Sequence, residues 1–178
     1  MPDKKNKIDE NYWKILNAAL ELDVKKGHLK WTVSDLSRKS GITRSLIYYY
    51  FGRSKVGILN EAIKLIGSEM AGLTPEREQM WNMGEFISSM QKARRTYENA
   101  PYLSIFISEH IQRDNDIGDA IRKIQDGFLK KIERHYKTST KSVRNAIYGI
   151  YWGLLFAPLQ DASSHEVVLT EAKKLLFK

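Results

Sequence analysis

The sequence predicts an all-α fold, and three observations support this class. Apolar residues recur at the 3.6-residue spacing of helices along most of the 178 residues. Serine, threonine and glycine stand where the expected helices begin and end. No segment alternates apolar and polar residues as a half-buried strand would. We therefore expect an N-terminal three-helix domain followed by a second helical domain.

Residues 32–51, TVSDLSRKSGITRSLIYYYF, are the most informative segment. Thr32 is a good N-cap, and Asp35 is placed to complete a capping box with it. Gly41 supplies the positive φ that ends the first short helix. Thr43 then caps a second helix. Two short helices, about 33–40 and 44–50, joined by a turn with glycine are typical of a helix-turn-helix unit, whose second helix enters the DNA major groove.

The residues before this unit are expected to support it. A helix over residues 10–26 carries an apolar stripe and ends in Lys25-Lys26-Gly27. Trp31 precedes the Thr32 cap at the position of a hydrophobic staple, so it is predicted to pack rather than to touch DNA. The basic residues 1–7 are interpreted as a flexible arm, with contact to DNA phosphates as the alternative.

Three consecutive tyrosines, Tyr48, Tyr49 and Tyr50, end the second short helix. They cannot all face the core of a helix, so at least one is expected to face solvent or a ligand. A tyrosine hydroxyl can donate to a phosphate. The alternative is that all three wedge between helices.

This order of residues, followed by Lys55, resembles the DNA-binding domain of the tetracycline-repressor (TetR) family over residues 10–66. The resemblance implies that Lys55 holds a phosphate at the start of a helix over about 55–72, capped by Ser54. Two departures are visible, since Ser45 replaces a common glycine and the link to Lys55 is one residue longer. Arg53 is therefore a candidate to share or replace the Lys55 contact. The predicted DNA contacts are Thr32, Ser34, Arg44, Ser45, Tyr48, Tyr49, Tyr50, Arg53 and Lys55, with Arg44 the best base reader because guanidinium pairs bidentately with guanine.

Charge agrees with a nucleic-acid partner without proving one. The formal net charge is +8, and the first 70 residues hold 13 basic and 8 acidic residues, which is +5 of that excess. Ordinary surface charge for solubility is the alternative. The chain lacks cysteine, which excludes disulfides and fits a reducing cytosol. No apolar run reaches a membrane span of about 18–20 residues, so we expect a cytoplasmic protein with no membrane contact.

The domain boundary is predicted near residues 70–75, which gives a DNA-binding domain, 1–70, and a helical regulatory and dimerisation domain, 71–178. Helices are expected over 84–99, 101–112, 115–136, 140–157 and 165–178. The helix 140–157 is apolar on much of its circumference and needs more than one partner. The resemblance implies a homodimer through the last two long helices. The alternative is that both are buried in the monomer.

The resemblance also implies a small-molecule effector, whose identity the sequence does not give, bound inside the second domain. The candidate pocket residues are aromatic, methionine and histidine side chains, which suit a core equally well: Trp81, Phe86, Met90, Tyr97, Phe106, His110, Tyr148 and Trp152. The four histidines are scattered, so no metal site is predicted, nor is any other cofactor. No phosphate loop or catalytic triad pattern indicates an enzyme.

The sequence thus predicts a homodimeric regulator of transcription that binds double-stranded operator DNA and is released by its effector, in the manner of a repressor. The residues do not separate a repressor from an activator. The alternative is a helical adaptor whose helix-turn-helix packs on a protein partner.

Overall fold

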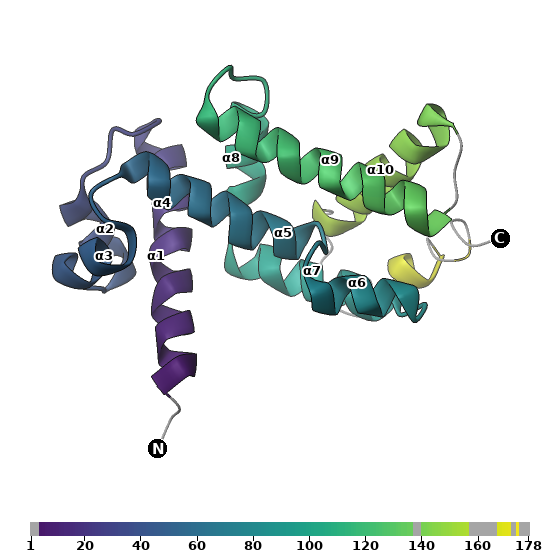
Figure 1. Cartoon of the computed structure of the whole chain (residues 1–178), viewed down its shortest axis with the longest axis horizontal. Coiled ribbons are helices and arrows are strands. Elements are labelled where there is room, and N and C mark those ends of the chain that lie inside the picture. Colours follow the sequence, from purple (N-terminus) through teal and green to yellow (C-terminus); the bar gives the residue numbers. More distant parts are fainter. Residues whose placement is uncertain (1–3, 137–139, 157–166, 172–173, 175–178) are drawn as a thin grey trace. The chain divides into compact units, whose positions relative to one another are not determined.

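The computed structural model describes residues 4–136, 140–156, 167–171 and 174, and every regular element within these ranges is helical. The predicted all-α class is confirmed. The helices (Figure 1) are α1 (Lys4–Lys26), α2 (Val33–Ser40), α3 (Arg44–Phe51), α4 (Lys55–Ala62), the π-helix η1 (Ile63–Gly67), α5 (Ser68–Met70), α6 (Pro75–Asn82), α7 (Phe86–Asn99), α8 (Tyr102–His110), α9 (Asp116–Tyr136) and α10 (Lys141–Phe156). Residues 167–171 and 174 are also helical, while the rest of the expected last helix lies outside the described residues.

Two predicted boundaries are wrong. The first helix begins at Lys4 rather than near residue 10, so most of the expected flexible arm is helical. The segment predicted as one helix over 55–72 consists of α4, the π-helix η1 and the short α5. A π-turn inserts one extra residue per turn, which the apolar spacing of this segment did not indicate.

The chain divides into two compact units, each described here by itself. Unit 1 comprises Met1–Gly67 and Ala100–Ile121, and unit 2 comprises Ser68–Asn99 and Arg122–Lys178. The segment that holds α8 thus groups with the N-terminal helices. The predicted division at residue 70 concerns function and stays a prediction.

In unit 1, α1 packs against α2, α4 and α8, and α2 packs against α3 (Figure 1). Each helix turns apolar side chains into a shared core, as the helical periodicity predicted. The fully buried members include Leu16, Leu20, Trp31, Leu36, Ile47, Leu59 and Phe106. Trp31 is a packing residue, as expected.

Unit 2 has a core with a buried polar network. The side chain of Arg77 is fully buried; its Nε donates to Ser89 Oγ at 2.9 Å and its Nη1 to the Glu69 carbonyl at 3.0 Å. The Tyr151 hydroxyl donates to the Met70 carbonyl at 2.7 Å. These bonds tie the end of α5 to α6, α7 and α10, and they add a side-chain donor to the Glu69 carbonyl, which also accepts from the Gly72 N–H at 3.1 Å.

Among the described helices, none has the length and the hydropathy that crossing a bilayer would require.

Candidate nucleic-acid interface

The helix-turn-helix begins with a complete capping box. The Asp35 backbone N–H donates to Thr32 Oγ1 at 3.1 Å, and the Thr32 backbone N–H donates to the Asp35 carboxylate at 2.8 Å. The bond from Lys26 and those from Thr32 hold the pKa of Asp35 well below its usual range. Gly41 ends α2 with φ of 73°, as predicted from its lack of a side chain. Sequence reasoning therefore located both ends of α2.

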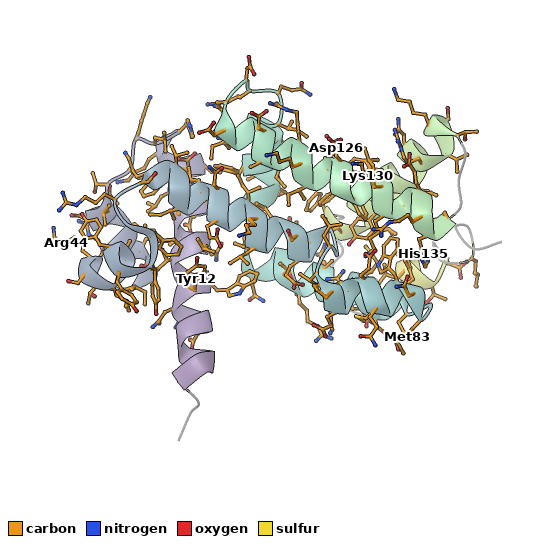
Figure 2. The ribbon with its side chains drawn as sticks, viewed as in Figure 1. Tyr12, Arg44, Met83, Asp126, Lys130 and His135 are labelled. Atoms are coloured by element: carbon orange, nitrogen blue, oxygen red, sulfur yellow. The ribbon has the colours of Figure 1, made fainter. Side chains whose placement is uncertain are left out.

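Helix α3 has one inward and one outward side. Thr43 caps it through a bond from the Leu46 N–H, and Ile47 is fully buried. Arg44 and Ser45 in its first turn are exposed. Figure 2 shows the Arg44 side chain extending away from the helices. An exposed guanidinium at the start of the second helix is free to reach a base edge.

The three tyrosines divide between solvent and packing. The side chain of Tyr49 is 82% exposed and that of Tyr48 is 39% exposed. Tyr50 is half-buried and packs edge-on against Tyr12 of α1, with ring centroids 5.6 Å apart. The alternative in which all three wedge between helices is therefore wrong. The Arg53 guanidinium lies 5.8 Å from the centre of the Tyr48 ring, so these two predicted DNA contacts are neighbours.

Two predicted phosphate ligands already have internal partners. The Thr32 hydroxyl accepts from the Asp35 N–H and lies 2.9 Å from the Asp35 carboxylate. The Lys55 ammonium donates to the Leu29 carbonyl and, at 3.1 Å, to the Trp31 carbonyl. It also lies 5.6 Å from the centre of the Trp31 ring. Lys55 thus fastens the start of α4 to the loop before α2, and its phosphate contact stays a prediction.

Ser34 completes the predicted set. It lies exposed in the first turn of α2, where backbone N–H groups and the helix dipole favour an anion. Seven of the predicted contacts are therefore exposed: Thr32, Ser34, Arg44, Ser45, Tyr48, Tyr49 and Arg53. The Thr32 hydroxyl is bonded to Asp35, while Tyr50 and Lys55 are half-buried in internal contacts.

The predicted effector residues do not fall in one unit. Phe106 and His110 belong to α8 in unit 1, whereas the other six belong to unit 2. Trp81, Phe86 and Met90 are buried, and Tyr97, Tyr148 and Trp152 are half-buried. Ring contacts join Trp81 to Phe86 at 5.7 Å and Tyr148 to Trp152 at 5.9 Å, as in an aromatic core.

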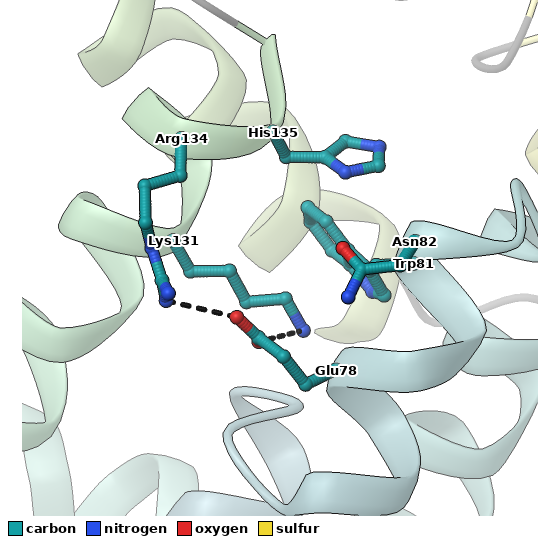
Figure 3. A pocket seen from close by; sticks show the side chains of 6 residues that line it. All are labelled: Glu78, Trp81, Asn82, Lys131, Arg134 and His135. Carbon is teal, nitrogen blue, oxygen red and sulfur yellow. Dashed lines mark hydrogen bonds and ion pairs between the residues drawn. The ribbon is translucent and has the colours of Figure 1, made fainter.

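Unit 2 also contains a pocket of about 400 Å³ that includes one of those residues (Figure 3). Its lining is more polar than the sequence led us to expect: Glu78, Trp81, Asn82, Lys131, Arg134 and His135. Glu78 pairs with Arg134 at 2.8 Å and with Lys131 at 3.4 Å. The Lys131 ammonium lies 4.1 Å from the centre of the Trp81 ring, and burial lowers its pKa to about 8. Periodicity gave no signal for these polar residues, because α6 and α9 bring them together from distant parts of the chain.

The structure assembles another cluster that sequence reasoning missed. Asp23, His28 and His110 offer ligand atoms that all lie within 4.8 Å of one another. Asp23 and His28 are five residues apart, a pair too common to signal a metal site alone, and the third ligand, His110, comes from α8. Only the packing of α8 on α1 could reveal this cluster.

Comparison with known proteins agrees with the geometry of α2 and α3. Residues 15–62 match the family model described as "Bacterial regulatory proteins, tetR family". No curated protein and no solved structure matches the chain. The matched residues include about half of α1, the whole helix-turn-helix and all of α4.

Proposed function

We propose that the chain, whose residues 15–62 match the TetR-family model, is a DNA-binding transcriptional regulator that acts as a cytoplasmic homodimeric repressor and is released from its operator by a small ligand. The observation that carries the proposal is the exposed outer side of α3, where Arg44, Ser45 and Tyr49 stand clear of the core formed by Ile47. A helix that is packed on its inner face and exposed to solvent on its outer face is suited to enter the major groove.

The roles on this surface follow from chemistry. Arg44 reads a base, since its five donors match the two acceptors of guanine. Ser34, Tyr49 and Arg53 hold phosphates and so set the register of α3 on the duplex. Arg53 is placed to replace much of the contact that Lys55 makes in the family pattern, because Lys55 donates internally.

A salt titration with DNA from upstream of its own gene tests this assignment. Arg44→Ala should relax discrimination at one base position by about 1–3 kcal/mol. Arg53→Ala should weaken all sequences alike and reduce the slope of log K against log salt by about 0.9 per lost phosphate contact. Lys130→Ala is the matched control, since Lys130 is an exposed cation on α9. If the wild type shows no salt-dependent binding to any DNA, the protein is an adaptor for a protein partner instead.

The dimer proposal is supported by the two faces of α10. One face buries Ile147, Tyr151 and Leu154 in unit 2. The other face leaves a stripe of residues exposed at helical spacing: Val143, Ala146, Ile150 and Gly153. Val143 is 50% exposed. A second copy of α10 would cover this stripe, as the family resemblance implies for the last two helices.

Sedimentation of variants tests the dimer. Ile150→Asp should shift the protein towards monomer, because a charge in a dimer interface lacks a partner. Ile105→Asp is the matched control, since Ile105 is an exposed isoleucine on α8. Equal monomer fractions in the two variants would show that α10 does not form the dimer interface.

The effector is proposed to bind the pocket in Figure 3 and to be a small organic anion. Arg134 and Lys131 offer charged donors that share the Glu78 carboxylate, and the Trp81 ring offers a flat apolar surface. A screen of aromatic and aliphatic carboxylates for release of bound DNA tests this. Arg134→Gln should abolish the response to the active compound and leave operator binding unchanged. An unchanged response would show that the effector does not bind at this pocket.

A further inference from the structure

The cluster of Asp23, His28 and His110 lies in unit 1 and is separate from the exposed face of α3. Asp23 is in the last turns of α1, His28 follows in the loop before α2, and His110 ends α8. The Asp23 and His110 side chains are 0% and 1% exposed, and that of His28 is 21% exposed. Neither the operator contact nor the effector pocket uses these groups.

One oxygen of the Asp23 carboxylate accepts hydrogen bonds that fix the group, and the other oxygen faces the two histidines. Its Oδ1 accepts from the Leu29 backbone N–H and from Trp31 Nε1, both at 2.8 Å. Its Oδ2 lies 2.9 Å from His28 Nδ1 and 3.5 Å from His110 Nε2. Two imidazole nitrogens therefore lie near the same carboxylate oxygen, and the hydrogen bonds to Oδ1 fix the orientation of that carboxylate.

The ring nitrogens of His110 make no hydrogen bond of ordinary length to the described residues. Its Nε2 makes a long contact with Asp23, and its Nδ1 is buried without a hydrogen-bond partner. Its ring is fixed by stacking on Phe106, with centroids 4.3 Å apart. The 3.5 Å separation is longer than an ordinary hydrogen bond, and a metal ion between Nε2 and the Asp23 carboxylate would give this nitrogen a ligand bond.

We propose that Asp23, His28 and His110 bind a divalent transition-metal ion of the zinc type. A tetrahedral ion with bonds of about 2.0–2.2 Å needs ligand atoms about 3.3–3.5 Å apart. The His110 separation of 3.5 Å meets that requirement, and all three ligand atoms lie within 4.8 Å of one another. The His28 separation of 2.9 Å is a hydrogen-bond distance and would lengthen by about 0.5 Å when an ion replaces the shared proton. The bonds to Asp23 Oδ1 are the outer-shell contacts that orient a carboxylate ligand.

The chemistry of the three ligands sets the class of ion. Two imidazoles and one carboxylate suit Zn²⁺, Co²⁺ or Ni²⁺, whereas Mg²⁺ and Ca²⁺ prefer oxygen ligands alone. Three protein ligands leave a fourth position for water or another small ligand. The bound ion would tie the loop that leads into α2 to the end of α8.

To test this, the full-length protein is treated with a chelator and then titrated with Zn²⁺ alone. Calorimetry measures the binding, and thermal unfolding measures the change in Tm. We expect one bound equivalent, and a rise in Tm of about 5–10 °C at a free concentration about 100 times Kd. His28→Gln should weaken the binding at least about 10-fold, and it is the safer variant because His28 is the partly exposed ligand. His110→Gln should do the same, with folding checked by circular dichroism.

Asp126→Asn is the control, since Asp126 is an exposed carboxylate on α9. It should bind Zn²⁺ as the wild type does. Titration with Co²⁺ adds an independent readout, because a tetrahedral site gives intense visible absorption that His28→Gln should remove. Absence of a bound equivalent, or equal affinities in His28→Gln and Asp126→Asn, would overturn the proposal.

Discussion

Lys55 offers a test that separates a structural role from a DNA contact. Its ammonium donates to the Leu29 and Trp31 carbonyls, and it lies over the Trp31 ring. Lys55→Met keeps much of the aliphatic stem and removes the ammonium together with both of its hydrogen bonds. A hydrogen bond from a charged donor contributes about 1.5–3 kcal/mol when buried, and Lys55 is half-buried. We therefore expect a loss of about 2–3 kcal/mol in the free energy of unfolding, or about 4–12 °C in Tm.

Urea unfolding measures this loss without DNA, and Lys64→Met is the matched control because the Lys64 side chain is 73% exposed. The same two variants are then compared in the salt titration with DNA. If Lys55 serves only the fold, the salt slope of Lys55→Met stays that of the wild type. Unchanged stability together with a slope reduced by about 0.9 would refute the structural role and restore the phosphate contact that the family pattern implies.

Three further predictions concern stability. Gly41→Ala should lower the free energy of unfolding by about 1 kcal/mol, because φ is 73° but no atom lies within 4 Å of an added Cβ. Gly72→Ala should cost more, about 2–3 kcal/mol, because φ is 65° and the added Cβ would lie 3.2 Å from Lys131 Nζ; equal losses in urea unfolding would contradict this. For Lys131, burial lowers the folded-state pKa to about 8 from 10.5. The unfolded chain then holds more protons between these values, so stability should rise by about 1–2 kcal/mol from about pH 8 to pH 9.5. Lys131→Met should lose this rise, and a slope shared by both proteins would assign it to other groups.

The helix-turn-helix could be predicted in detail because its signals are local. Thr32, Asp35, Gly41 and Thr43 act on atoms close to them in the chain, so spacing alone located the ends of α2 and the start of α3. The division of the tyrosines followed from geometry too, since consecutive residues of a helix point in different directions. The predicted exposure of at least one tyrosine is confirmed by Tyr49.

Local sequence signals did not indicate several features of the structure, most of which depend on contacts between residues distant along the chain. The apolar stripe of Ile58, Ala62 and Ile66 fits an α-helix, so periodicity did not reveal the π-turn of η1. The grouping of residues 100–121 with the N-terminal helices depends on α8 packing against α1. The polar pocket and the Asp23 cluster likewise join side chains from helices that are far apart along the chain.

The internal bonds of this helix-turn-helix change how a family pattern should be used to assign DNA contacts. A position that holds a phosphate in a relative can do so here only if its donors are free. The Thr32 hydroxyl faces the Asp35 carboxylate and also caps α2, so a phosphate at Thr32 would compete with the bond that starts the helix. Weaker DNA binding in a Thr32 variant could therefore result from fraying at the start of α2 or from loss of a phosphate contact, and binding alone would not separate the two causes. Arg44 and Arg53 lack this ambiguity because both are exposed at the edges of α3, and they are the residues on which the operator contact should be mapped first.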